Sequence, residues 1–120
     1  MSKEVVMING SARKKTTYNL VVQIGEILKA RGIETEIINL FDYELKDCVG
    51  CEVCVTHEKC GLNDDMKEIM QKIIDSDGVV FSSPVYMRSV TSKFKTFVDR
   101  TNIWIHKPSL AGKPVMFATT

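Results

Sequence analysis

The stretch EVVMINGSARKKTTYNLVVQIGEILKARG, residues 4–32, decides the expected fold. It opens with a short apolar run rich in β-branched side chains, residues 4–9, which is typical of a strand buried on both faces. Gly10 ends that run, and a polar loop follows it. From residue 18 onward apolar side chains recur at helical spacing, and Gly32 is placed to end the helix. The stretch therefore predicts a strand, a loop and a helix.

The same alternation continues along the rest of the chain. Strands are expected over 35–40, 78–84 and 113–119, and helices over 64–77 and 90–104. Strands that alternate with helices predict a parallel sheet with helices on both faces. Ligands of such sheets bind outside the C-terminal ends of the strands. The loops after the first and third strands, and the two threonines at the end of the chain, 119–120, are therefore the candidate ligand segments.

Composition favours one globular domain over residues 1–120, since 44% of the residues are hydrophobic and 26% are charged. Sixteen basic and fifteen acidic residues give a net charge of +1, so no field of one sign favours nucleic acid or an anionic membrane. The N-terminus lacks a secretory signal, and no apolar run approaches the roughly 20 residues that span a bilayer. We expect a cytoplasmic protein, in which cysteines are thiols, ligands or redox couples rather than structural disulfides.

The loop after the first strand, GSARKKTT (10–17), has the residue types of an anion site. It combines hydroxyl donors and cations with the N-terminus of the following helix, which favours a bound phosphate. The alternative is a solvated basic turn in which Thr16 or Thr17 caps the helix. Neither the dinucleotide motif G-x-G-x-x-G nor the nucleoside triphosphate motif G-x-x-x-x-G-K-[ST] is present, so a phosphate monoester is the favoured guest. The donors and cations are Ser11, Thr16, Thr17, Arg13, Lys14 and Lys15.

The loop after the third strand, SSPVYM (82–87), would lie at the other end of the same ligand. Pro84 fixes its backbone, and Tyr86 supplies a flat amphipathic face against which an aromatic ring system could rest. A rigid turn with Tyr86 half-buried for packing is the alternative when this loop is taken by itself. The two loops together favour a ligand with a phosphate at one end and a flat ring at the other.

All the cysteines of the chain lie in one segment, CVGCEVCVTHEKC (48–60), with the spacing C-x2-C-x2-C-x5-C. Four nearby thiolates can hold a 4Fe–4S cluster or one zinc ion, and zinc sites usually come as two separated pairs, so the spacing favours iron and sulfur. A redox thiol pair and unligated loop thiols are the alternatives. We expect His57 to be a solvated side chain. The candidate metal ligands are Cys48, Cys51, Cys54 and Cys60.

Four pieces of the chain, INGSARKKTTYNL (8–20), the cysteine segment, residues 64–100 and KPVMFATT (113–120), resemble one family when found in this order. This is the NADPH-dependent FMN reductase family of flavodoxin-like proteins, and within it the iron–sulfur flavoproteins. The resemblance implies a flavodoxin-like doubly wound parallel sheet, FMN as cofactor and a cluster on the cysteines. It places the FMN phosphate at Ser11, Arg13, Thr16 and Thr17, and the isoalloxazine at Pro84, Val85, Tyr86 and Met87.

Against the family pattern, the chain stops at Thr120, where a third flavin-contacting loop, a fifth strand and two helices would follow. We therefore expect the fold to be truncated after its fourth strand, which leaves an unpaired edge and uncovered apolar sheet surface. Self-association into a homo-oligomer is the expected remedy. A fragment that binds flavin poorly is the rival interpretation.

The expected function is an FMN-dependent oxidoreductase with small-molecule partners. Electrons would pass from NAD(P)H or a reduced carrier through FMN to a quinone or another acceptor, and a cluster would split the electron pair. A non-enzymatic flavin and iron–sulfur electron carrier is the alternative. No catalytic side chain is expected, since flavin chemistry needs none. Asp64 and Asp65 are expected to cap the helix that follows them, and Asp99 and Arg100 to have structural roles.

Overall fold

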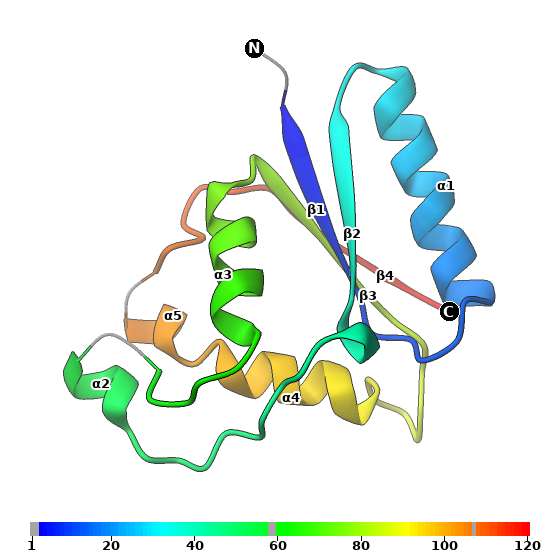
Figure 1. Ribbon diagram of the computed structural model, residues 1–120. Helices are drawn as coiled ribbons and strands as arrows, with labels where there is room; N and C mark the ends of the chain where they lie inside the picture. Colours follow the sequence, from blue (N-terminus) through cyan, green and yellow to red (C-terminus); the bar gives the residue numbers. More distant parts are fainter. Residues whose placement is uncertain (1–2, 58–59, 107) are drawn as a thin grey trace.

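The computed structural model describes residues 3–57, 60–106 and 108–120. Within them, four strands form one parallel sheet in the order β2-β1-β3-β4 (Figure 1). The predicted parallel sheet is confirmed, with strand bounds within two residues of those expected. The strands are β1 (Glu4–Asn9), β2 (Glu34–Asn39), β3 (Gly78–Ser83) and β4 (Val115–Thr119).

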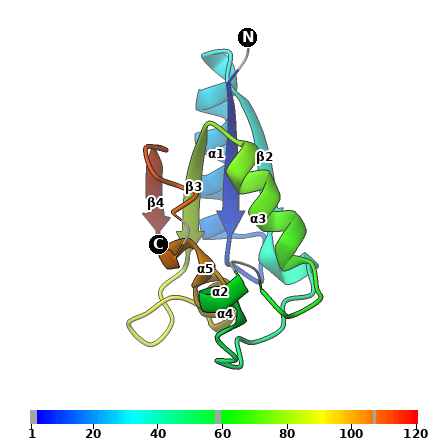
Figure 2. The ribbon, with the colours of Figure 1, turned by 90° about the vertical axis from the view of Figure 1, so that its left-hand side faces the viewer.

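Helices cover both faces of this sheet, as predicted. Helix α1 packs on one face, and α3 and α4 lie on the other (Figure 1). Figure 2 shows the sheet nearly face-on, with α3 in front of it and α1 behind. The helices are α1 (Thr16–Ala30), α2 (Val53–His57), α3 (Met66–Asp75), α4 (Ser92–Arg100) and α5 (Ile103–His106), and a 3-10 turn, η1 (Leu40–Asp42), follows β2.

Alternate residues of β1 separate two buried clusters, because successive side chains of a strand point to opposite faces. Val6 and Ile8 pack with α3 and α4 in the larger cluster, and Met7 packs with Val21 of α1 in the smaller one. All four of these side chains are fully buried. The continuous apolar run that predicted β1 therefore fills both halves of the core.

Helix α1 ends as the sequence predicts. Gly32 has a positive φ of 79°, which glycine adopts without strain. Its N–H donates to the Lys29 carbonyl at 3.0 Å, and the Ile33 N–H donates to the Leu28 carbonyl at 3.0 Å. This pattern satisfies the last carbonyl groups of the helix and turns the chain into β2.

The prediction of a single helix over 90–104 is wrong, because the structure has two helices there, α4, which ends at Arg100, and α5, which begins at Ile103. The Thr101 hydroxyl donates to the Val98 carbonyl at 2.6 Å and competes with the backbone for that acceptor. The short helix α2, within the cysteine segment, was not predicted. Apolar periodicity carries no signal for a helix of one turn.

Strand β4 forms one end of the sheet over the described residues, with β3 as its neighbour. Its side chains Val115, Met116 and Phe117 are each about half exposed, at 52%, 49% and 51%. The expected uncovered apolar surface at the fourth strand is therefore confirmed. No helix of the described residues is long and apolar enough to cross a membrane.

Candidate functional site

The two candidate ligand loops begin side by side, because β1 and β3 are parallel neighbours that end together. Asn9 is the register partner of Ser82, and the Gly10 N–H donates to the Ser82 carbonyl at 2.8 Å. A Cβ atom on Gly10 would lie 2.9 Å from Cβ of Phe94 on α4, which is too close for any side chain. Glycine is therefore required where the first loop leaves the sheet.

Thr91, the N-cap of α4, holds both loops in place. Its hydroxyl donates to the Gly10 carbonyl at 2.7 Å and accepts from the Phe94 N–H at 3.2 Å. Its own N–H donates to the Ser83 hydroxyl at 3.1 Å, and the Thr91 side chain is buried. One buried residue thus fixes the start of the first loop and the end of β3 relative to each other.

These contacts bring seven of the eight residues predicted for a flavin around one open pocket. An additional cation, Lys15, and Thr120, which follows β4, complete its lining. The pocket lies at the C-terminal ends of β1, β3 and β4, where the fold class predicts a ligand. Its lining residues are Ser11, Arg13, Lys15, Thr16, Thr17, Pro84, Val85, Tyr86 and Thr120.

Met87, the eighth predicted residue, lies outside that lining and is 98% exposed. It forms the tip of a two-residue turn with Arg88, and both have positive φ, 48° and 64°. Tyr86 and Ser89 close the turn through two backbone hydrogen bonds of 2.9 Å. Residues other than glycine are strained in this conformation, and the turn holds Tyr86 at the rim of the pocket.

The N-terminus of α1 opens on this pocket without a side-chain cap. Its N-cap residue is Lys15, so the alternative in which Thr16 or Thr17 caps the helix is wrong. Thr17 is buried and shares a hydrogen bond of 2.5 Å with the Thr120 hydroxyl. Backbone N–H groups of a first helical turn that lack a side-chain acceptor suit an anionic group. The basic loop and the N-terminus of α1 therefore both favour an anionic group in this pocket.

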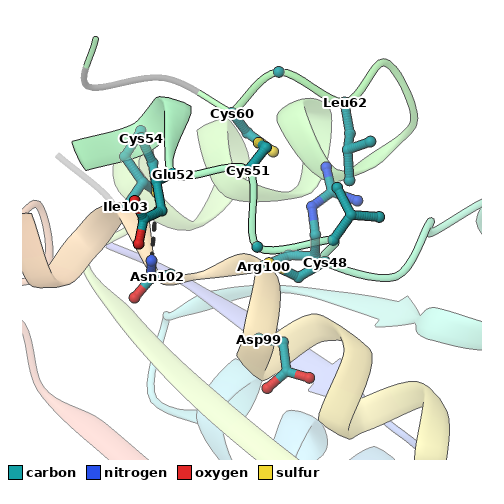
Figure 3. Close-up of a pocket in the computed structure, with 13 residues that line it drawn as sticks. Cys48, Cys51, Glu52, Cys54, Cys60, Leu62, Asp99, Arg100, Asn102 and Ile103 are labelled. Carbon is teal, nitrogen blue, oxygen red and sulfur yellow. Dashed lines mark hydrogen bonds between the residues drawn. The ribbon is translucent and has the colours of Figure 1, made fainter. Parts of the chain in front are cut away.

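A second pocket lies at the other end of α4 and is lined by all four cysteines (Figure 3). Cys48 and Cys51 are exposed, and Cys54 and Cys60 are half-buried. The Asn102 side-chain amide donates to Sγ of Cys54 at 3.3 Å. Among the described residues, no three His, Cys, Asp or Glu side chains are grouped closely enough to hold a metal ion. His57 is exposed and is absent from this lining, as expected.

Behind this pocket lies a buried ion pair between Asp64 and Arg100. Nη1 of Arg100 lies 2.5 Å from Oδ2 of Asp64, and Nη2 lies 3.0 Å from Oδ1. The side chains are 1% exposed for Arg100 and 0% for Asp64. Burial would raise the pKa of Asp64, but hydrogen bonds from Arg100 and two backbone N–H groups outweigh it and lower the pKa to about 2.

The pair also joins the two ends of the cysteine segment. The Lys46 N–H donates to Oδ2 of Asp64 at 2.7 Å, and Nη1 of Arg100 donates to the Lys46 carbonyl at 2.8 Å. Lys46 precedes the first cysteine and Asp64 follows the last one. Oδ1 of Asp64 also accepts from the Met66 N–H at 3.1 Å, so part of the predicted capping role is confirmed.

The sequence profile of the NADPH-dependent FMN reductase family matches residues 4–120. The chain belongs to this family. Its membership confirms the resemblance drawn from the four segments of the sequence.

Several curated relatives bear the name iron–sulfur flavoprotein. One from Methanocaldococcus jannaschii is 41% identical over 101 residues, which are 82% of this chain and 51% of the relative. One from Archaeoglobus fulgidus is 37% identical over 100 residues, 83% of this chain and 49% of the relative. One from Clostridioides difficile is 37% identical over 120 residues, 97% of this chain and 53% of the relative. The chain spans about half the length of the curated relatives it matches.

Solved structures of flavin enzymes share the fold. A flavone reductase has a TM-score of 0.73 at 20% identity, covering 97% of this chain and 42% of its own. The NAD(P)H:acceptor oxidoreductase FerB from Paracoccus denitrificans has a TM-score of 0.71 at 21% identity, and the match covers 98% of this chain and 60% of FerB. The predicted flavodoxin-like fold of this family member is therefore confirmed.

Most residues of the first pocket of this FMN reductase relative were expected there, and several of the cysteine pocket were not. The end of the chain was expected at the C-terminal edge of the sheet, and Thr120 closes the first pocket because β4 lies beside β3. Asn102 reaches the cysteines because the helix predicted over 90–104 is broken just before it. Asp99 and Arg100 were assigned structural roles, and Arg100 proves to line the cysteine pocket as well.

Proposed function

We propose that the pocket at the ends of β1, β3 and β4 binds FMN. The observation that carries the proposal is the convergence of two loops that are 70 residues apart in the sequence. Ser11, Arg13, Thr16 and Thr17 would hold the phosphate, helped by the uncapped N-terminus of α1. Pro84, Val85 and Tyr86 would lie against the isoalloxazine, with Met87 at the outer rim.

The proposed activity is transfer of electrons from NAD(P)H or another reduced carrier, through FMN, to a quinone or another acceptor. When bound, FMN supplies the redox chemistry, so the chain needs no nucleophile of its own. The task of the loop side chains is to bind and orient the cofactor. Arg13 and Lys15 supply charge toward the phosphate, and Pro84 and the turn at Tyr86 supply a rigid wall.

Replacing Arg13 by glutamine is expected to weaken FMN binding by about tenfold, equivalent to ~1.4 kcal/mol, because one cation facing the phosphate is lost. Quenching of FMN fluorescence on titration with the 120-residue chain measures the affinity. The matched control is Arg31→Gln, an exposed site at the far end of α1, which should leave the affinity unchanged. Failure of the parent chain to quench FMN fluorescence would contradict the proposed cofactor site.

We propose further that the four cysteines hold a 4Fe–4S cluster. The donor types fit, because four thiols line one pocket, and they would have to draw closer together around a cluster than they lie in this structure. The name iron–sulfur flavoprotein, borne by the curated relatives, supports an iron–sulfur centre without specifying its type. When bound, such a cluster exchanges single electrons, which would suit a chain that also takes electron pairs through FMN.

Anaerobically purified protein is expected to contain iron and acid-labile sulfide, and its absorbance should show a broad shoulder beside any flavin bands. Replacing Cys51 by serine should remove most of that iron, since a thiolate ligand is lost. Equal iron in the parent and in this variant would contradict the assignment. Zinc without sulfide would favour a structural zinc site, and NAD(P)H oxidation with added FMN and a quinone tests turnover independently.

A further inference from the structure

The C-terminal end of α4 presents two nitrogen donors to the cysteine pocket. Arg100 is the last residue of α4, and Asn102 follows it before α5 begins. Both side chains line the pocket together with the four cysteines, and Figure 3 shows them on the side where α4 ends. Asp99 also lines this pocket, but its carboxylate forms an ion pair with Lys95 on the same helix.

Arg100 uses only part of its hydrogen-bonding capacity on the ion pair. Its two Nη atoms bind Asp64 and the Lys46 carbonyl, as described above. Its Nε is buried and has no hydrogen-bond partner among the described residues. A buried N–H group without an acceptor is costly, so Nε calls for an acceptor within this pocket.

The guanidinium shares its pocket with sulfur atoms, because Arg100 and all four cysteines line it. Asn102 already donates to Sγ of Cys54 at 3.3 Å. One sulfur atom thus accepts from a nitrogen donor just beyond α4, and a second donor group, at the last residue of α4, lines the same pocket.

We propose that Arg100 Nε–H and the Asn102 amide are positioning donors to the sulfur atoms held in this pocket, and that they raise the reduction potential of the bound cluster. This inference rests on the proposed 4Fe–4S site. A reduced cluster carries one more negative charge than an oxidised one, and N–H donors directed at its sulfur atoms stabilise that form. Removing a donor therefore lowers the potential and leaves the ligands in place.

The test is a redox titration of the reconstituted 120-residue chain, followed by electron paramagnetic resonance, in the parent and in Asn102→Leu. Leucine keeps the size of the side chain and removes the donor, and it leaves the Asp64–Arg100 pair intact. The equilibrium constant for reduction should fall about tenfold, a shift of ~59 mV to lower potential for one electron. The iron and sulfide content should match the parent. Gln23→Leu, an exposed amide on α1, is the control and should not shift the potential.

Arg100→Lys separates charge from geometry, because lysine keeps a cation for Asp64 and has no N–H at the Nε position. A downward shift of similar size is expected, and Arg31→Lys, exposed at the end of α1, is its control. If Arg100→Lys does not fold, Asn102→Leu still decides the proposal. A cluster with an unchanged potential in Asn102→Leu overturns the donor role and leaves the proposed cluster standing. A parent chain without iron and sulfide overturns both.

Discussion

Replacing Asp64 by alanine is expected to lower the free energy of unfolding by about 3–5 kcal/mol, because Arg100 remains buried without its counter-charge. The side chains of the two residues are 0% and 1% exposed, so water does not replace the lost carboxylate. The backbone N–H groups of Lys46 and Met66 lose their acceptor in the same substitution. Urea unfolding followed by circular dichroism measures the loss.

Two further variants show whether the lost charge pairing is the cause. Asp42→Asn changes an exposed carboxylate and should alter the free energy of unfolding by less than ~0.5 kcal/mol. The double substitution Asp64→Leu with Arg100→Met removes both charges and should recover much of the lost stability, as apolar replacements of buried pairs often do. A double variant no more stable than Asp64→Ala would argue against the ion pair as the origin of the effect.

The same carboxylate gives a pH dependence of known sign. Its pKa is about 2 in the folded chain, below the ordinary value of 3.8, so the folded chain favours the charged form. The stabilisation is therefore fully present above pH 3.8 and is lost as the pH falls toward 2. Urea midpoints measured through this range should fall less steeply in Asp64→Asn than in the parent. Parallel profiles would contradict the lowered pKa.

Replacing Phe97 by alanine is expected to cost about 3–5 kcal/mol of folding free energy, the usual range for a buried aromatic ring. Phe97 is 2% exposed and lies on the inner face of α4. Its ring centroid is 5.9 Å from that of Phe81 on β3 and 5.8 Å from that of Phe94. The substitution would leave a cavity where α4 packs on the sheet. Calorimetric or urea unfolding measures the loss of folding free energy.

This substitution should also weaken both proposed cofactor sites, because α4 carries Thr91 at one end and Arg100 at the other. Val98→Ala on the same helix is the control, since Val98 is 42% exposed and faces away from the core. The control should lose less than about 1 kcal/mol. If Phe97→Ala lowers stability and leaves FMN binding and iron content unchanged, α4 does not position the two sites.

The strands could be predicted from the sequence because a parallel sheet leaves a strong local pattern. Residues 5–8 and 79–81 are continuous apolar runs, and the structure places them between helices on both faces of the sheet. The end of α1 was predictable for a local reason too, since Gly32 alone among its neighbours adopts positive φ without strain. Structural features that depend on one residue or on its immediate neighbours in the chain can therefore be predicted well from the sequence.

The environment of the cysteines could not be predicted, because it depends on contacts between distant segments. Asp64 and Arg100 are 36 residues apart, and each has an alternative local role that residue types favour equally well. Asp64 was expected at a helix cap, and it does accept the Met66 N–H, but its main partner is on α4. The convergence of the two ligand loops and of Thr120 was predictable, since parallel strands end at the same edge of the sheet, and Lys15 was already among the cations named for the first loop.

Hydrogen bonds among Lys46, Asp64 and Arg100 hold the two ends of residues 46–64 together at α4, so this segment is a candidate for grafting into another protein. Its two ends are fastened to α4 and to each other through Lys46 and Asp64, and Asp47 adds a contact with Thr96 of α4. A graft bounded at residues 46 and 64 is therefore expected to keep its two ends together in a flavodoxin-like host that supplies a matching arginine. A shorter graft that omits Lys46 or Asp64 would lose the hydrogen bonds that hold one of its ends to the other and to α4.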